Sequence, residues 1–296
     1  MLAKARDLAD RLLPAFAKSP TGMPYRFVNL HSGDVSGNVN VLAEIGTCVT
    51  EFGDLSRLTG DPKYVAAAKA AQKAVFDRRS ALDLVGTSIN IETGDWVDTT
   101  STMNPPVDSF FEYLFEGFQF LGDRDDLRMY HTLITAFLRR QTVEINGRTW
   151  FTSADMDTGL TTSIEQSELA SFAAGMLGQS GFLREGRAYE RSWTEARRRG
   201  GYRILPEGLD PATLGATSKG NQLRPEYVDS AFNLWLQTGN RLYVDLAAEY
   251  YAAQRATSRV TDASGALVGY TILDDVTVRP ERQGATSRRP TGTRRT

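Results

Sequence analysis

Residues 105–123 read Pro-Pro-Val-Asp-Ser-Phe-Phe-Glu-Tyr-Leu-Phe-Glu-Gly-Phe-Gln-Phe-Leu-Gly-Asp. The stretch predicts one helix with Asp108 at its start and Gly122 at its end, because acidic residues suit the first turn of a helix and glycine suits the residue after the last turn. Apolar side chains lie on nearly all sides of this predicted helix, which is typical of a helix surrounded by other helices. The stretch therefore indicates an inner helix of a larger helical assembly.

The same arrangement recurs along the chain about every sixty residues, a longer period than the roughly 34 to 47 residues of the common helical solenoids. Each copy has an apolar helix headed by a carboxylate, a break at a glycine, and a second helix that opens with tyrosine. The breaks are at Gly60, Gly122, Gly186 and Gly239, and the tyrosines are Tyr64, Tyr130, Tyr189 and Tyr243. The acidic heads are Glu44, Asp108, Glu168 and Glu226. Stacked helical hairpins would bring these four carboxylates to one end of the assembly.

Hydrophobic periodicity places the helical pairs along the chain. The first pair is expected at about 40–58 and 62–77, the partner of the Asp108 helix at 127–138, and the last pair at 226–236 and 241–255. Alternation in 85–98 and an Asn-Gly turn within 143–151 predict two small β-hairpins. The predicted fold is all-α: a partial toroid of about four to five helical hairpins, with small β-hairpins in its loops, over residues 1–283.

The composition is that of a folded protein with no bias toward a charged partner. The chain has 296 residues, of which 41% are hydrophobic and 24% are charged, and its net charge is −2. This balance argues against nucleic acid or an anionic membrane as a partner, and no run reaches the ~18 apolar residues that suggest a membrane span. Residues 284–296 are basic and lack a hydrophobic period, so we expect a disordered tail there. No signal-peptide core is visible at the N-terminus, and the sequence leaves the protein's location open.

The carboxylates at the helix starts are the candidates for chemistry. An isolated Asp108 would be explained by its favourable interaction with the helix dipole, but four acidic heads in phase favour a functional role for at least two of them. Second carboxylates follow one turn later, at Glu112 and Asp229, on the same helical faces as Asp108 and Glu226. Acidic side chains on apolar inner helices are costly unless they meet water, a ligand or a partner such as Arg224. Paired carboxylates across a cavity are the minimal apparatus for hydrolysing a glycosidic bond.

Other residue types give weaker signals. Trp96 and Trp150 lie in the predicted hairpins and could stack on sugar rings, whereas Trp193 and Trp235 are expected in the core. The two histidines are too few and too far apart for a metal site or a triad. No glycine-rich phosphate loop and no zinc-ligand spacing is present.

Several stretches together resemble glycoside hydrolase family 47, the class I α-1,2-mannosidases, including the branch of ER degradation-enhancing mannosidase-like proteins. The stretches are Gly22-Met-Pro-Tyr-Arg-Phe-Val-Asn-Leu, Glu51-Phe-Gly-Asp-Leu-Ser-Arg-Leu-Thr-Gly-Asp-Pro-Lys-Tyr, Asn104-Pro-Pro-Val-Asp-Ser-Phe-Phe-Glu-Tyr-Leu and Leu223-Arg-Pro-Glu-Tyr-Val-Asp-Ser. The resemblance implies an (α/α)7 barrel. It also implies inverting hydrolysis of terminal α-1,2-linked mannose from oligosaccharides or N-glycans.

The resemblance further implies roles for individual residues. Asp108 matches a family aspartate that is a candidate catalytic acid or water-relay residue. Glu226 matches the usual candidate for the general base. Positions that line the −1 sugar subsite are matched by Glu44, Glu112, Arg224 and Asp229, with Asp229 standing where glutamate is more usual; Glu168 is expected to contact substrate as well.

The family also holds Ca²⁺ at the floor of its barrel, where the ion binds the 2- and 3-hydroxyls of the sugar, a task that suits a hard cation. Two family segments have no counterpart in the sequence: a first repeat with another candidate acid would precede Met1, and the segment whose threonine ligates Ca²⁺ would follow Gln283. The family's Asp-His-Leu is replaced by Ser167-Glu168-Leu169. We therefore expect no side-chain metal ligand in this chain, and the sequence leaves its catalytic competence open.

Two other functions fit the same residues. One is a protein that binds a mannose-containing oligosaccharide or glycoprotein without cleaving it. The other is a different (α/α)-barrel glycosidase, such as a glucosidase, against which only the Arg-Pro-Glu and Asp-Ser-Phe-Phe-Glu-Tyr contexts argue. Unpaired inner helices of a partial toroid would in addition favour aggregation or dimerisation.

Overall fold

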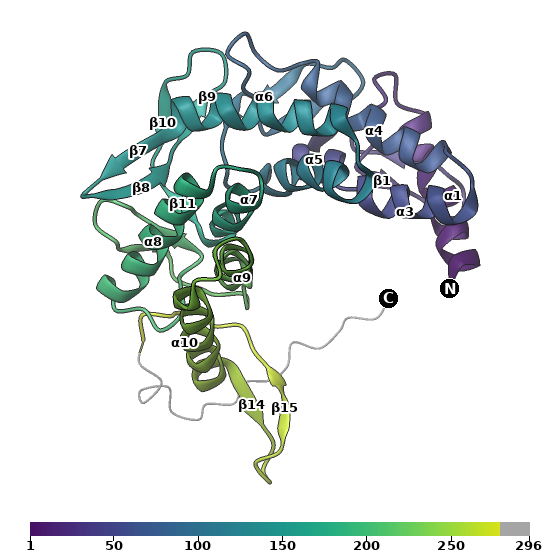
Figure 1. Ribbon diagram of the computed structural model, residues 1–296. Coiled ribbons are helices and arrows are strands. Elements are labelled where there is room, and N and C mark those ends of the chain that lie inside the picture. Colours follow the sequence, from purple (N-terminus) through teal and green to yellow (C-terminus); the bar gives the residue numbers. More distant parts are fainter. Residues whose placement is uncertain (279–296) are drawn as a thin grey trace.

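A computed structural model describes residues 1–278 of the chain. Its helices form an open arc of pairs, with one helix of each pair on the concave side and its partner on the convex side (Figure 1). The concave helices are α2 (Leu42–Gly46), α3 (Val49–Thr59), α5 (Asp108–Leu121), α7 (Ala173–Gln179) and α9 (Glu226–Thr238). The convex helices are α4 (Lys63–Phe76), α6 (Arg124–Gln141), α8 (Leu183–Arg199) and α10 (Arg241–Ser258), and α1 (Leu2–Ala17) opens the chain. The expected fold of stacked helical pairs is confirmed.

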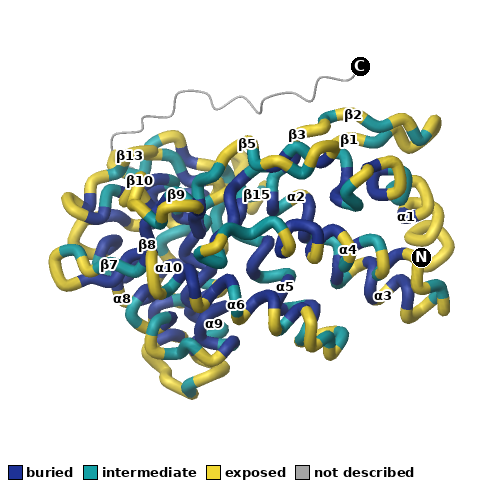
Figure 2. Tube along the Cα trace, turned by 90° about the horizontal axis from the view of Figure 1, so that it is seen from above, coloured by how far each residue is buried: buried dark blue, intermediate teal, exposed yellow. Residues whose placement is uncertain are grey.

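Short antiparallel strands connect the pairs, and most of them lie along one edge of the arc, as the labels β1, β2, β3, β5, β10 and β13 show in Figure 2. The two-stranded sheets are β1 (Phe27–Val28) with β2 (Val35–Ser36), β7 (Thr142–Ile145) with β8 (Arg148–Phe151), and β14 (Arg259–Thr261) with β15 (Leu267–Tyr270). The three-stranded sheets are β3 (Val39–Val41), β4 (Ser88–Asn90) and β5 (Trp96–Asp98); β10 (Thr161–Ser163), β9 (Ser153–Asp155) and β6 (Thr100–Ser101); and β11 (Gln166–Ser167), β12 (Gly208–Leu209) and β13 (Ala216–Ser218).

Both expected hairpins are present. β4 pairs with β5, and β7 pairs with β8. The turn between β7 and β8 holds Asn146 at φ 51° and Gly147 at φ 73°. Two consecutive residues at positive φ make the turn that fits the twist of a two-residue hairpin, which is why Asn-Gly signals it.

The glycine breaks are confirmed at three of the four expected positions. Gly60, Gly122 and Gly239 follow α3, α5 and α9 in the left-handed conformation, with φ between 64° and 72°, as a helix C-terminal glycine allows. The break expected at Gly186 is wrong, because Gly186 lies inside α8. The chain turns instead at Gly181, where φ is 96°.

Gly186 has a packing role instead. A Cβ atom there would lie 2.4 Å from the carbonyl oxygen of Ala174, so a glycine is needed where α8 crosses α7. Gly46 and Gly175 serve the same purpose between concave helices. A Cβ on Gly46 would lie 2.4 Å from the Phe110 ring, and a Cβ on Gly175 would lie 2.9 Å from the Cα atom of Ser230. These glycines hold α2 close to α5 and α7 close to α9.

The hydrophobic core fills the space between the concave and convex helices. The four tyrosines of the repeat are all buried, as are Phe110, Phe111, Leu114 and Phe115 of α5. Tyr64 and Tyr243 open α4 and α10 as expected, but Tyr130 and Tyr189 lie inside α6 and α8. Burying one such large apolar side chain contributes about 1.5–3 kcal/mol, so this layer fixes where the concave helices begin and which side chains they turn toward the arc's interior.

Three expectations about elements need correction. The first concave helix, expected as one helix over 40–58, is divided into α2 and α3 at Thr47–Cys48. Trp150, expected to offer a face to sugars, is fully buried against Trp193. Trp235, expected in the core, is 37% exposed on α9.

The tail expected at 284–296 and the end of the predicted domain at 283 lie outside the described residues. Within residues 1–278, no helix is both long enough and apolar enough to span a membrane.

Candidate active site

The acidic heads of the concave helices come from separate hairpins and lie at the edge of the arc where the strands gather. Asp108 is the first residue of α5 and Glu226 is the first residue of α9. Glu168 begins the 3₁₀ helix η1 (Glu168–Phe172) that leads into α7, and Glu44 lies in the first turn of α2. The repeated helix start therefore places one carboxylate from each of four successive units at this edge of the arc.

The charge of Arg224 acts on both Asp108 and Glu226, and the charge of Asp108 acts on Glu226. Burial raises the pKa of Asp108, while the Ser109 N–H and the charge of Arg224 lower it in part. Burial also raises the pKa of Glu226, opposed by a backbone N–H and Arg224 and reinforced by the charge of Asp108. Both groups remain partly open to solvent. Both carboxyls therefore hold a proton more readily than ordinary carboxyls, which suits groups that transfer protons.

Arg224 is held by Glu207, which lies in the loop before β12. The Arg224 Nε atom donates to both Glu207 carboxylate oxygens at 3.1 and 3.0 Å, and its Nη2 atom lies 3.0 Å from Glu207 Oε2. This pairing fixes the guanidinium plane. The side chain is about three-quarters buried, at 24% exposure, so its charge acts on Asp108 and Glu226 with little screening by solvent.

A second row of carboxylates lies one turn further along the helices, at Glu112 and Asp229. Burial and the charges of Glu116, Asp229, Asp108 and Glu226 raise the pKa of Glu112 to about 8. The pKa of Asp229 is raised by burial and lowered in part by the Asn233 amide, which donates to it at 3.0 Å. Because the Glu112 carboxyl is protonated at neutral pH, it can both donate and accept hydrogen bonds there.

These deeper side chains line a groove of about 420 Å³ between α5, α7 and α9. Its walls carry amides and carboxyls in a connected network: Gln119 Nε2 donates to Gln179 Oε1 at 3.1 Å, and Gln179 Nε2 donates to Asn233 Oδ1. The lining residues are Glu112, Phe115, Glu116, Gln119, Phe120, Met176, Gln179, Asp229 and Asn233. A polar groove rich in acceptors, with an apolar patch, suits a neutral ligand that carries many hydroxyl groups.

Glu168 and Glu44 take different positions. Glu168 is fully buried, and its carboxylate accepts from the Tyr250 hydroxyl at 2.6 Å and from the Asn221 amide at 2.7 Å. Burial raises the pKa of Glu168 well above its usual value. Glu44 is exposed and pairs with Arg26 at 2.9 Å. The structure therefore brings Asp108, Glu112, Arg224, Glu226 and Asp229 together, places Glu168 behind them inside the protein, and leaves Glu44 at the rim.

Three further acidic residues join this cluster although sequence reasoning did not select them. Glu116 lies one turn beyond Glu112, and burial and the charges of Glu51 and Asp229 raise its pKa. Glu51 of α3 accepts from the Tyr113 hydroxyl at 3.2 Å. The i, i+4 spacing from Asp108 through Glu112 could have revealed Glu116. Glu207 carries no such signal, since the strand pairing of β12 brings it to Arg224.

The described residues contain no group of three or more His, Cys, Asp or Glu side chains arranged to hold a metal ion.

Comparisons with known proteins place the chain among glycosidases. A model of glycosyl hydrolase family 47 matches residues 1–287. The chain is 33% identical to alpha-mannosidase I MNS5 of Arabidopsis thaliana over 94% of its own length and 47% of the relative's length. It is 32% identical to human ER degradation-enhancing alpha-mannosidase-like protein 2, covering 88% of this chain and 44% of that one. The chain spans about half the length of these curated relatives.

The arc also matches a solved structure. An alpha-1,2-mannosidase from Trichoderma reesei superposes with a TM-score of 0.78 at 25% sequence identity, over 93% of this chain and 63% of that one. The helical pairs and the strands between them thus follow the course of a known mannosidase.

Proposed function

The chain belongs to glycosyl hydrolase family 47, and on that premise we propose that its carboxylate groove binds the terminal α-1,2-linked mannose of an oligosaccharide or N-glycan for inverting hydrolysis. The observation that carries the proposal is that Asp108 and Glu226, at the starts of α5 and α9, share the charge of Arg224 and lie one turn before Glu112 and Asp229, which line the groove. Two carboxyls on opposite sides of a scissile bond are what glycosidic hydrolysis requires.

In the proposed reaction Asp108 supplies a proton, directly or through a water molecule, to the glycosidic oxygen. The bond between that oxygen and the anomeric carbon breaks, and the leaving sugar departs as an alcohol. Glu226 takes a proton from a water molecule on the opposite face, and the oxygen of that water bonds to the anomeric carbon. The released mannose is then the β-anomer. Burial of Asp108 supports its role, since it raises the pKa of the carboxyl and so favours the protonated form that a general acid needs.

The remaining groups would orient the sugar. Glu112, Arg224 and Asp229 lie close to both proposed catalytic groups and offer donors and acceptors to sugar hydroxyls. Glu168, with its carboxylate engaged by Tyr250 and Asn221, would support the site from behind. Glu44 at the rim would meet a more distant part of the glycan.

The family resemblance implies Ca²⁺ at the floor of the site. The described residues contain no side-chain cluster that fits such an ion, so no step above uses it. The effect of calcium is tested by adding Ca²⁺ or EDTA in the experiment below.

The proposal is tested by incubating the full chain with α-1,2-mannobiose, with Ca²⁺ or with EDTA, and following the anomeric protons by NMR. β-Mannose is the expected first product. Asp108→Asn and Glu226→Gln are each expected to slow its release by about 10²–10⁴-fold, the usual contribution of a general acid or base. Asp125→Asn is the matched control, because Asp125 is an exposed carboxylate at the start of the convex helix α6.

α-Mannose as first product would reject inversion, and an Asp108→Asn variant as active as the control would reject the role of Asp108. Binding of the disaccharide without any turnover would favour the second function, a glycan-binding protein. Release of glucose from an α-glucoside instead of mannose would favour a different glycosidase specificity.

A further inference from the structure

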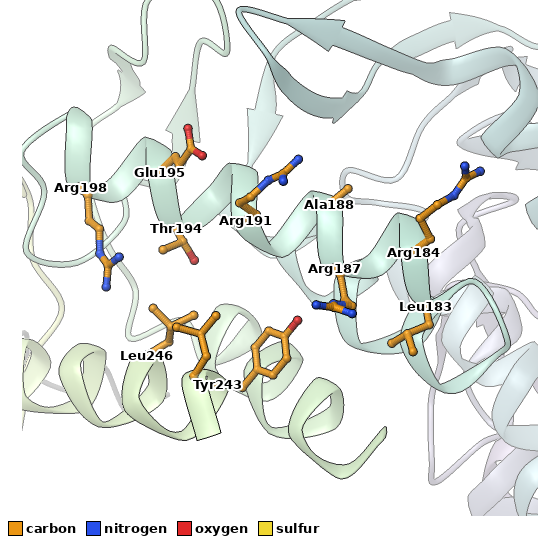
Figure 3. Close-up of a pocket in the computed structure, with 11 residues that line it drawn as sticks. Leu183, Arg184, Arg187, Ala188, Arg191, Thr194, Glu195, Arg198, Tyr243 and Leu246 are labelled. Carbon is orange, nitrogen blue, oxygen red and sulfur yellow. The ribbon is translucent and has the colours of Figure 1, made fainter. Parts of the chain in front are cut away.

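A second depression lies between two convex helices, α8 and α10, outside the carboxylate groove. It measures about 660 Å³ and is larger than the groove between α5, α7 and α9. Figure 3 shows α8 on one side and α10 on the other, with side chains of both helices lining the space between them. We call this depression the arginine groove. No step of the proposed hydrolysis uses it.

The floor of the arginine groove is apolar. Leu183 and Ala188 contribute from α8, and Leu242, Tyr243 and Leu246 contribute from α10. Tyr243 and Leu246 are buried and belong to the core, whereas Leu242 is 51% exposed. The floor can therefore accept a further apolar surface without any rearrangement of the core.

The α8 wall is strongly cationic. Arg184, Arg187, Arg191 and Arg198 all line the groove, against one carboxylate, Glu195. Glu195 is engaged elsewhere, with Arg148 at 3.4 Å and Arg199 at 3.7 Å. The groove thus concentrates positive charge in a chain whose net charge is −2.

Two of these arginines have no carboxylate partner among residues 1–278. Arg198 pairs with Glu249 at 3.0 Å and Arg184 pairs with Glu185 at 2.8 Å. Arg187 and Arg191 make no such pair within the described residues, and they lie one turn apart on α8. Arg187 points into the groove beside Tyr243 (Figure 3). Arg187 interacts with the Tyr243 hydroxyl, whose pKa is raised by burial and lowered in part by the charge of Arg187. Neither guanidinium is paired with a carboxylate within residues 1–278, so both can pair with a ligand that brings carboxylates.

The arrangement of the arginines fits a long ligand better than a small one. Arg184 and Arg198 are separated by about 21 Å along the helix, at a rise of 1.5 Å per residue. The guanidiniums do not converge, since Arg187 and Arg198 point into the groove while Arg184 and Arg191 point away from its floor (Figure 3). One small anion can reach only one or two of them.

We propose that the arginine groove binds an acidic amphipathic helix of a partner protein. A helix laid along the groove would place apolar side chains at i, i+3, i+4 and i+7 on Leu242 and its neighbours. Carboxylates on the flank of that helix would meet Arg187 in the groove, and would meet Arg191 once its flexible side chain turns toward the groove. The forked donors of both side chains suit carboxylates. The positive charge of the groove favours a negatively charged partner, and the length of the groove favours an elongated one.

The test uses a fluorescein-labelled helical peptide of about 20 residues, long enough to span the groove, with leucines on one face and glutamates on its flanks. Its binding to the full chain is followed by fluorescence anisotropy at low and high salt. A second peptide has lysine in place of every glutamate. We expect the acidic peptide to bind at least about tenfold more tightly than the basic one, and its affinity to fall with salt.

The double variant Arg187→Glu/Arg191→Glu is expected to weaken binding of the acidic peptide by about tenfold or more. Arg139→Glu/Arg140→Glu is the matched control: it reverses two exposed arginines on the convex helix α6 and changes the net charge equally. Circular dichroism reports whether each variant keeps its fold.

Equal binding of the two peptides, or equal affinity of the two double variants, would overturn the proposal. Failure of the acidic peptide to bind would do the same. Saturable one-to-one binding of monomeric decyl sulfate in place of the peptide would assign the groove to small anionic amphiphiles instead, and binding only to phosphatidylserine vesicles would assign it to a membrane surface. None of these readings depends on whether the concave groove hydrolyses mannosides.

Discussion

Burial and the charges of four neighbouring carboxyl groups all favour the protonated form of Glu112. They raise its pKa to about 8, while in an unfolded chain a glutamate titrates near a pKa of about 4.3. The folded protein therefore binds this proton more tightly than the unfolded chain does. The stability gained in this way is fully present below the unfolded pKa and is lost as the pH rises through the folded pKa.

Glu112→Gln removes the titration, so the variant should gain stability relative to the wild-type protein as the pH rises from 5 to 9. Each 1 kcal/mol would raise the melting temperature by about 2–4 °C in a chain of this size. Thermal unfolding by circular dichroism at both pH values measures the difference. Glu144→Gln, at an exposed position on β7, is the control and should show no such trend. If the difference in melting temperature between Glu112→Gln and wild type is the same at both pH values, the account is contradicted.

The sequence was sufficient for part of the site. The carboxylates of α5 and α9 could be predicted because a repeated helix start fixes both their position and their direction. The roles of Glu51 and Glu207 could not, since Glu51 lies on α3 without a repeat to match and Glu207 reaches Arg224 through the pairing of β12. The engagement of Glu168 by Tyr250 was also beyond the sequence, because the two residues are joined only by tertiary packing.

Among the elements, the contact between α7 and α9 depends on Gly175. A Cβ atom at this position would lie 2.9 Å from the Cα atom and 3.2 Å from the Oγ atom of Ser230, and the Gly175 N–H donates to the same Oγ atom at 2.8 Å. The backbone of α9 cannot yield as a flexible side chain can. Because α9 carries Glu226 and Asp229, this contact also positions the candidate site.

Gly175→Ala is therefore expected to destabilise the protein. Overpacking lowers the free energy of unfolding by about 1–3 kcal/mol, whereas the better helix propensity of alanine raises it by about 1 kcal/mol. We therefore predict a net loss of stability on the order of 1 kcal/mol. Urea unfolding measures it. The control is Gly269→Ala on β15, where an added Cβ meets nothing within 4 Å and the change should be close to zero. A Gly175→Ala variant as stable as that control would show that α7 and α9 are not held by this contact.

The helical pairs could be predicted because inner helices are apolar nearly all round and end at glycine. The mistake at Gly186 shows the limit of that signal. A glycine after an apolar run can end a helix, as Gly181 permits with its positive φ, or it can admit a neighbouring backbone, as Gly186 admits Ala174. Only the packed structure separates the two uses.

At the scale of the whole described arc, its two grooves differ in charge. Carboxylates from successive hairpins face one another across the concave groove, while arginines of α8 line a groove between convex helices. A neutral, hydroxyl-rich ligand suits the first surface, and an acidic one suits the second. The family assignment, the arc and the groove thus lead to the same central claim, that the concave side receives a mannose residue.

A crystal structure of the Asp108→Asn variant with α-1,2-mannobiose tests that claim most directly, because the variant should bind the disaccharide without cleaving it. The account predicts a mannose ring in the concave groove, with the glycosidic oxygen within about 3 Å of the substituted amide side chain or of a water molecule that it holds, and Glu226 facing the opposite side of the anomeric carbon. Disaccharide bound only elsewhere, or no density in that groove at saturating concentration, would contradict it.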